Sequence, residues 1–172
     1  MGTPTVRELI DLHYQPLFRY AFRLSGSSAD AEDLTQETFG KVVSRLTQLR
    51  DTERAKPWLF RILRNEYLRR IRDDKRHKLV PLDSIGDLST QTVVETSDID
   101  PAALQAALNE LDETFRTPLI LFYFEDFSYR DIAEQMDLPI GTVMSRLARA
   151  KTYLRTKLGP NSEPNGRLTE GE

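Results

Sequence analysis

The 172-residue chain contains no cysteine and only two histidines, His13 and His77. Without cysteine it can form no disulfide, no thiol nucleophile and no thiolate metal site. Zinc prefers several nitrogen or sulfur ligands, which two histidines far apart in the sequence do not supply. We therefore expect no metal and no cofactor. The absence of cysteine also suits a reducing cytoplasm.

Long apolar runs are absent as well. No stretch approaches the roughly 20 apolar residues that a membrane-spanning helix needs, and residues 1–5 contain no apolar signal core. We expect a cytoplasmic protein with no membrane insertion. The chain also lacks a glycine-rich phosphate loop and a nucleophile paired with a base, so we expect no enzymatic activity.

Charge is sorted along the chain, although the net charge is only −3. Residues 61–78 contain eight Lys and Arg against three acidic residues, and residues 142–157 contain five Lys and Arg with no acid. Residues 79–100 contain five acidic residues and no Lys or Arg. The net charge alone argues against a simple nucleic-acid binder. A random solvated surface, however, would not be sorted into two basic segments and an acidic connector.

The pattern of apolar residues predicts an all-α fold of two small helical domains. The first domain spans residues 5–78 and the second spans residues 102–158. Residues 79–101 are rich in Ser, Thr and Asp and lack helical periodicity, so we interpret them as an extended acidic linker. Residues 159–172 have no apolar face and are predicted to form a disordered tail.

Prolines and apolar spacing predict further features of the helices. Pro16 is expected to kink or restart the first helix, and Pro57 suits the first turn of a long helix that runs to about Lys78. Residues 118–124 could be a buried strand by periodicity alone, but we predict a helix because no partner strand is evident in that domain. In the second helix, which Ser27 or Asp30 could cap, the expected apolar face consists of Leu34, Phe39, Val42, Val43 and Leu46.

Residues 128–158 predict a helix-turn-helix, which is the main feature of the second domain. Ser128 and Asp131 form a capping box, and Asp137 stands at the turn, where Asp tolerates the left-handed conformation. Pro139 pre-sets the first turn of the next helix. Residues at core spacing in that helix are Val143, Leu147, Ala150 and Leu154. The residues left to face outward are Thr142, Ser145, Arg146 and Arg149.

The outward residues of this helix suit the major groove of DNA. Arg makes paired hydrogen bonds to guanine, and Ser and Thr reach bases or phosphates. The alternative is an amphipathic surface helix with solvated arginines. The capping box, the turn and the one-signed charge together favour DNA contact.

Residues 58–72 separate into two faces when they are placed at 100° per residue. The expected core face consists of Leu59, Phe60, Leu63, Tyr67 and Ile71. The opposite face gathers Trp58, Arg61, Ile62, Asn65, Arg69 and Arg72. Exposed rings among cations are typical of single-stranded DNA binding, where rings stack on bases and arginines hold phosphates. Alternatively, Trp58 packs against a neighbouring helix and the arginines are solvated.

Three stretches together resemble a known family. DAEDLTQETF (30–39), PWLFRILRN (57–65) and DFSYRDIAEQMDLPIGTVMSRLARAK (126–151) are similar, in this order, to conserved regions two and four of the extracytoplasmic-function (ECF, group IV) sigma factors of bacterial RNA polymerase. The resemblance runs from about Val6 to Leu158. It implies an alternative sigma factor that binds core polymerase, directs it to promoters through −35 and −10 elements, and assists DNA melting.

The resemblance also implies which residues form each site. Docking on the clamp coiled coil of the largest polymerase subunit would involve Asp33, Gln36, Glu37 and Phe39. The −10 element would be read and melted by Trp58, Arg61, Asn65, Arg69 and Arg72, with residues 50–56 forming a pocket for a flipped base. The −35 element would be read by Thr142, Met144, Ser145, Arg146 and Arg149. On residues alone, the acidic cluster at 30–37 would be a solvated face that favours its own helix N-terminus.

In the helix predicted to read the −35 element, the sequence departs from the common family pattern at two positions. Met144 stands where Lys or Arg is frequent, and Ala148 stands where an aromatic residue or His is common. The implied partners are core RNA polymerase, promoter DNA and an anti-sigma factor. The main alternative is a conventional helix-turn-helix regulator that binds duplex operators, which explains residues 128–158 but gives no role to Trp58, Asn65 or the acidic helix.

Overall fold

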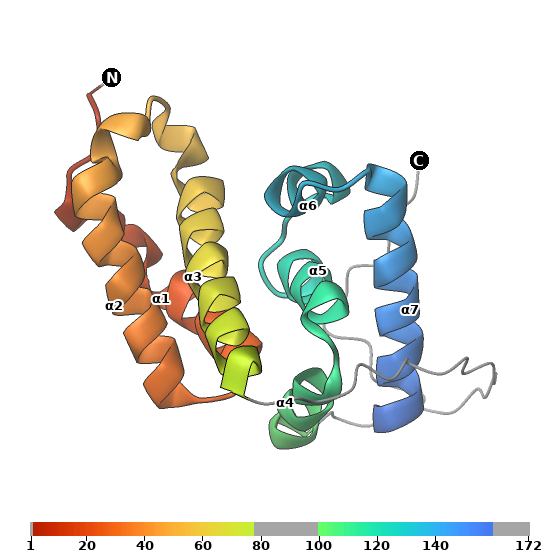
Figure 1. The fold of residues 1–172 in the computed structure, drawn as a ribbon. Helices are drawn as coiled ribbons and strands as arrows, with labels where there is room; N and C mark the ends of the chain where they lie inside the picture. The colour runs from red at the N-terminus through yellow and green to blue at the C-terminus, as the bar shows by residue number, and fades with distance from the viewer. Residues whose placement is uncertain (1, 78–99, 160–172) are drawn as a thin grey trace. The chain divides into compact units, whose positions relative to one another are not determined.

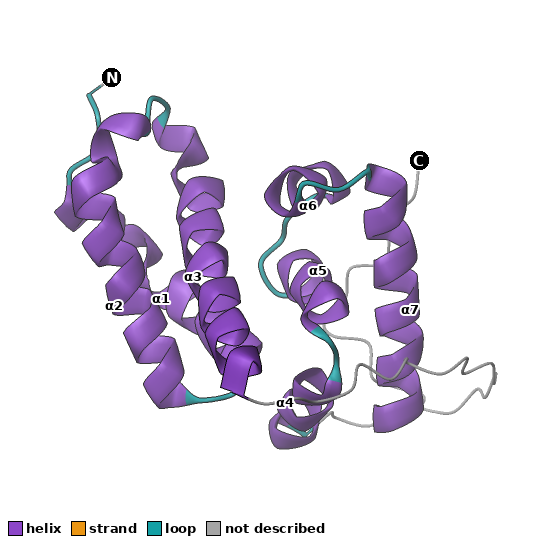
Figure 2. Cartoon of the chain, in the orientation of Figure 1, coloured by secondary structure: helices purple, strands orange, loops and turns teal. Residues whose placement is uncertain are grey.

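A computed structural model of the chain describes residues 2–77 and 100–159. The chain divides into two compact units, residues 1–84 and residues 85–172. Every regular element in the described ranges is helical (Figure 1, Figure 2), which confirms the expected all-α class. The linker predicted at 79–101 lies outside the described residues except for its last two positions, and so does the predicted tail beyond residue 159. None of the described helices is long and apolar enough to cross a membrane.

The first unit packs three α-helices against one another: α1 (Val6–Ser25), α2 (Ser28–Arg45) and α3 (Ala55–His77). Two short 3-10 turns, η1 (Leu46–Gln48) and η2 (Thr52–Arg54), lie between α2 and α3. Pro57 lies in the first turn of α3, as predicted. Of the kink or restart expected at Pro16, the restart is wrong, because α1 continues through that residue. Proline removes one backbone hydrogen bond, and buried leucines on both sides of it, Leu9 and Leu17, anchor the helix in the core.

Local signals set the ends of these helices. Thr5 and Glu8 form a capping box at the start of α1. Gly26 ends α1 in the left-handed conformation with φ of 72°, which glycine adopts without a Cβ clash. Ser27 then caps α2 by accepting a hydrogen bond from the backbone N–H of Asp30 at 3.3 Å.

The core of the first unit lies where the three helices meet. The rings of Tyr20 and Phe60 stack with their centroids 4.8 Å apart. The Tyr67 hydroxyl donates to the backbone carbonyl of Leu24 at 2.9 Å and so ties α3 to the end of α1. On α2 the buried apolar residues are Leu34, Phe39 and Val42. The expectation for Val43 is wrong, because its side chain is 65% exposed.

Within residues 100–159 the second unit contains four helices: α4 (Pro101–Glu110), α5 (Glu113–Tyr123), α6 (Tyr129–Met136) and α7 (Ile140–Leu158). α7 packs against each of the other three. The Asp100 side chain caps α4 by accepting from the backbone N–H of Ala102 at 3.2 Å. Residues 118–123 lie in α5, which confirms the helix and excludes the strand for this segment.

α6 and α7 form the predicted helix-turn-helix. Ser128 and Asp131 make the capping box, and Asp137 is left-handed with φ of 55°. The backbone N–H of Leu138 donates to the carbonyl of Ala133 at 3.0 Å and closes the turn. The four residues predicted to face the core from α7 are all buried: Val143, Leu147, Ala150 and Leu154. A second left-handed residue, Asp126 with φ of 61°, lies between α5 and α6 and was not predicted.

Candidate nucleic-acid interface

The outward face of α7 begins directly after the tight turn at Asp137. Met144, Ser145 and Arg149 are exposed, while Thr142 and Arg146 are half-buried at the edge of the packed face. All five predicted −35 residues are therefore at least partly accessible, and Thr142, Ser145, Arg146 and Arg149 share one side of the helix. In the described part of the chain, Arg146 and Arg149 form no ion pair. Their guanidinium groups are therefore not neutralised by a neighbouring acid.

Arg149 has an aromatic neighbour instead of an acidic one. Its guanidinium carbon lies 5.5 Å from the centroid of the Phe115 ring on α5. A cation at this distance from a ring is attracted by the ring's negative face. The contact restricts Arg149 without using any of its N–H donors, so these remain available to an acceptor such as a base edge.

The far end of α7 is fastened to α4. The Tyr153 hydroxyl donates to the Glu110 carboxylate at 2.6 Å, and the Lys157 ammonium lies 2.9 Å from the same carboxylate. The hydrogen bonds from Tyr153 and Lys157 lower the pKa of Glu110 below its usual range. Burial and the bond to Glu110 raise the pKa of Tyr153, so it remains a hydroxyl donor. Together with the turn at Asp137, this contact fixes α7 at both ends.

α3 presents the second predicted DNA surface. Arg61, Asn65, Arg69 and Arg72 are exposed, and Trp58 is half-buried. The placement of Ile62 on this exposed face is wrong, because Ile62 is 5% exposed. α3 packs against both α1 and α2, so its buried arc is wider than a helical wheel with one apolar side suggests.

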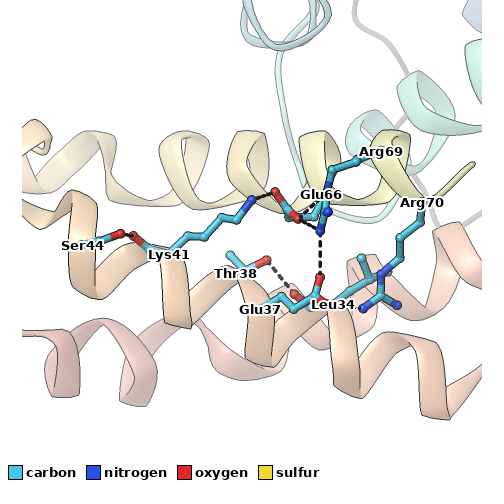
Figure 3. Close-up of polar contacts among 8 residues, drawn as sticks. All are labelled: Leu34, Glu37, Thr38, Lys41, Ser44, Glu66, Arg69 and Arg70. Carbon is cyan, nitrogen blue, oxygen red and sulfur yellow. Dashed lines mark hydrogen bonds and ion pairs between the residues drawn. The ribbon is translucent and has the colours of Figure 1, made fainter. Parts of the chain in front are cut away.

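Two arginines of α3, Arg69 and Arg70, are bound to acidic groups, which the sequence did not indicate (Figure 3). Arg69 donates from Nε and Nη2 to Glu66 Oε2, at 3.2 and 2.8 Å. The same Nη2 lies 3.9 Å from Glu37 on α2. Arg70 forms an ion pair with the other oxygen of Glu37 at 3.0 Å. Glu66 is also paired with Lys41 of α2.

Of the four predicted docking residues of α2, the structure exposes three and buries one. Asp33, Gln36 and Glu37 are exposed, whereas Phe39 is only 7% exposed. The Phe39 ring stacks on Tyr14 with the centroids 6.3 Å apart. Phe39 therefore belongs to the core, as its place on the predicted apolar face indicates, and holds α2 against α1.

Two further residues lie on the exposed side of α2 beside the predicted docking residues. Gly40 and Val43 follow Gln36 and Glu37 at helical spacing, and both are exposed. A Cβ at Gly40 would meet no atom within 4 Å, so packing within the described residues does not require glycine there. The signal that could have found this surface was the glycine in the middle of a helix, where glycine is unfavourable. We define the docking face of α2 as Asp33, Gln36, Glu37, Gly40 and Val43.

Residues 50–56, which are predicted to form a pocket for a flipped base, run through η2 into the start of α3. Residues 50–54 are exposed, and Asp51 accepts from the backbone N–H of Glu53 at 2.9 Å. The Lys56 ammonium lies 5.6 Å from the centroid of the Phe60 ring. No group of three or more metal-ligating side chains occurs in the ranges 2–77 and 100–159.

Known families match the two units separately. Residues 9–77 match Sigma-70 region 2, and residues 102–154 match Sigma-70, region 4. Among curated proteins, the ECF RNA polymerase sigma factor SigE of Mycolicibacterium smegmatis is 35% identical over 165 residues, which cover 92% of this chain and 63% of SigE. The ECF RNA polymerase sigma factor SigL of Mycobacterium tuberculosis is 33% identical over 156 residues, which cover 89% of this chain and 88% of SigL.

A solved structure is similar as well. It is the sigma factor RpoE in complex with the anti-sigma factor NepR from Bartonella quintana, with a TM-score of 0.73 and 30% identity. The similarity covers 88% of this chain and 95% of the matched chain.

Proposed function

The chain belongs to the ECF sigma factors of bacterial RNA polymerase, and from this premise we propose that it reads promoters through two separate helical surfaces. It is an alternative sigma factor, and sigma factors direct promoter-specific transcription initiation. We assign the −35 element to α7, the −10 element to α3, and core polymerase docking to the docking face of α2.

The assignment of α7 rests on its outward face. Arg146 and Arg149 have no acidic partner in the described ranges, and Ser145 beside them is exposed. Side chains that read a duplex must reach base edges with their donors unoccupied. Met144 has no charged group to offer, so it can contact only apolar groups such as a thymine methyl. This difference from the common family pattern favours a −35 sequence of its own.

The assignment of α3 rests on Asn65, which is exposed between Arg61 and Arg69 on one side of the helix. An amide can read an unstacked base edge, and the flanking guanidinium groups can hold phosphates. Trp58 is half-buried, so part of its ring is accessible for stacking. This set of side chains suits a melted strand better than a closed duplex.

The docking assignment rests on the exposed acids of α2. Asp33 and Glu37 give this face negative charge, and Gly40 allows close approach of a partner backbone. A basic, elongated partner surface such as a coiled coil fits this chemistry. With core polymerase the two DNA surfaces act on one promoter. The polymerase supplies the catalysis, and we propose that the chain itself has none and acts in the cytoplasm.

An anti-sigma factor is a further proposed partner. The similar sigma factor of Bartonella quintana was solved with one bound. Such a protein would have to cover at least one of the proposed surfaces in order to inhibit the chain. Hydrogen exchange of α2, α3 and α7 with a co-purified inhibitor would identify which one.

The proposal is tested by adding the purified chain to core polymerase. We expect the two to co-elute in gel filtration, and transcription of a genomic fragment library to start at sites that share −35 and −10 sequences. We expect the free chain to bind promoter duplex poorly, since its net charge is −3. A conventional regulator would instead bind an operator tightly by itself and would not co-elute with polymerase.

A further inference from the structure

Glu66 is an unusual residue for the middle of a helix that faces DNA. It lies on α3 and is only 4% exposed. Burying a carboxylate is unfavourable unless the charge is paired and hydrogen-bonded. Neither the resemblance nor the proposed function gives this residue a role.

The partners of Glu66 come from two helices (Figure 3). One carboxylate oxygen is paired with the Lys41 ammonium on α2, and the other accepts both hydrogen bonds from Arg69. Burial alone would raise the pKa of Glu66, but the hydrogen bonds and charges of Lys41 and Arg69 outweigh it and lower that pKa below its usual range. Glu66 therefore remains a carboxylate whenever the domain is folded near neutral pH.

The geometry leaves one side of Arg69 available. Its hydrogen bonds use Nε and Nη2, so none of those recorded in the described ranges uses Nη1. The Arg69 side chain is 53% exposed, and a guanidinium offers five N–H donors in a rigid planar arrangement. Fixing one edge of that plane fixes the direction in which the other edge points.

The unused N–H donors of Arg69 make this side of the network attractive to an anion. Lys41, Arg69 and Arg70 contribute three positive charges, and Glu66, Glu37 and Asp73, whose charge also acts on Arg69, contribute three negative charges. The network is therefore close to neutral as a whole. A phosphate that approaches Nη1 is attracted by the remaining donors of a charged guanidinium rather than by an excess of positive charge.

We propose that Glu66 is a positioning residue for promoter opening, which holds the Arg69 guanidinium so that its free edge meets the phosphates of the melted −10 strand. The inference rests on the proposed function of α3. A free arginine must lose its side-chain freedom when it binds a flexible strand, whereas an arginine already held by Glu66 has lost part of it beforehand.

The test compares three variants in holoenzyme. Glu66→Gln removes the charge that holds Arg69. Lys41→Met is the matched control, because it removes the contact between α2 and Glu66 while the bond between Glu66 and Arg69 remains. Arg69→Ala removes the group that Glu66 is proposed to act through. For each, we would measure the thermal melt, core polymerase binding, and transcription from matched duplex and pre-melted promoters.

Glu66→Gln should lower transcription from the duplex promoter by roughly three- to tenfold, the effect of ordering one long side chain. The pre-melted promoter should partly restore it, and core polymerase binding should be unchanged. Lys41→Met should open promoters normally. In the Arg69→Ala background, Glu66→Gln should cause no additional loss.

Other outcomes would overturn the inference. A defect of equal size in Lys41→Met would mean that Glu66 acts only by joining α2 to α3. Normal opening by Glu66→Gln, with a defect in Arg69→Ala, would refute the role of Glu66 and leave the proposed function intact. Normal opening by Arg69→Ala would refute the −10 role of Arg69 in the proposed function itself.

A charge exchange covers the case in which Glu66→Gln does not fold. Lys41→Glu combined with Glu66→Lys restores an ion pair between α2 and α3 but places an ammonium beside Arg69. We expect this double variant to melt near the parent temperature and still open promoters poorly. Normal opening by the folded double variant would refute the inference.

Discussion

The arginines on the two helices that carry the proposed DNA surfaces have different interaction partners. On α7, Arg149 lies over the Phe115 ring, and neither it nor Arg146 has an acidic partner in the described ranges. On α3, Arg69 and Arg70 are bound to Glu66 and Glu37. The difference matches the two forms of DNA. A duplex has rigid base edges that free donors can reach, whereas a melted strand is flexible and is better held by groups whose positions are already fixed.

The largest expected effect is on the docking step that both surfaces need. Asp33→Lys should weaken core polymerase binding by roughly 2 kcal/mol or more, as expected when a charge at an interface is reversed. The matched control is Asp11→Lys, which makes the same charge change at an exposed position on α1. The measurement is the affinity for core polymerase, with circular dichroism to verify the fold.

Glu37 is a poor choice for that experiment. Its carboxylate pairs with Arg70 and approaches Arg69, so Glu37→Lys would disturb the α2–α3 contact as well as the docking face. Polymerase binding by a folded Asp33→Lys variant at parent affinity would refute docking through this face.

The next effect separates the two DNA surfaces. Asn65→Ala should impair opening, and Arg149→Ala should weaken −35 recognition, each by roughly 1–3 kcal/mol for the loss of a good base contact. A pre-melted template supplies the opening energy in advance, so it should restore Asn65→Ala more than Arg149→Ala. The measurement is transcription from matched duplex and pre-melted promoters.

Arg155→Ala is the matched control for Arg149→Ala, because both changes remove an exposed arginine from α7. Loss of a base contact should relax the preference at one −35 position, whereas loss of a phosphate contact weakens binding to all sequences alike. If the pre-melted template restores Arg149→Ala better than Asn65→Ala, the division between α7 and α3 is wrong.

A smaller effect would show whether the Phe115 ring orients Arg149 on α7. Phe115→Leu removes the ring under Arg149 and should weaken −35 binding by about 0.5–1 kcal/mol, the size of an exposed cation–π contact. Phe115→Tyr keeps a ring and should bind like the parent. The measurement is holoenzyme affinity for duplexes with intact and altered −35 elements. Equal affinities for Leu and Tyr variants would show that the ring does not orient Arg149.

The smallest expected effect is on the pH dependence of stability in the first unit. Burial, with the charge of Lys56, lowers the pKa of His13 below its ordinary value of 6.5. The unfolded chain therefore binds this proton more readily, and the stability of the first unit should fall as the pH drops below about 6.5. His13→Asn should reduce that loss in thermal melts between neutral pH and pH 5. An unchanged pH dependence would contradict the burial of a neutral His13.

The helix-turn-helix could be predicted in detail because its signals are local. The capping box at Ser128, the left-handed Asp137 and the buried side of α7 each depend on residues a few positions apart. The ion pairs of α3 could not be predicted in this way. Glu37 and Arg69, like Lys41 and Glu66, are distant in sequence and meet only because α2 packs on α3.

The errors in the predicted core have a related cause. Ile62 was placed outward and Val43 inward, because a helical wheel assumes one buried direction for each helix. α3 has two packing partners and so buries Ile62. Phe39 was assigned to the docking site by resemblance and to the apolar face by spacing, and its burial against Tyr14 confirms the second of these. A family motif shows which residues matter together, but not which of them are reached by a partner.

At Gly40, thermal stability and polymerase binding favour different residues. A glycine in a helix is about 0.5–1 kcal/mol less favourable than alanine, and an added Cβ would meet no obstacle here. A laboratory selection for thermostable variants would therefore find Gly40→Ala early. Because the position lies on the docking face of α2, we expect bulkier replacements found in the same way to lose polymerase as they gain melting temperature. A thermostabilised variant that must still bind polymerase should therefore keep Gly40.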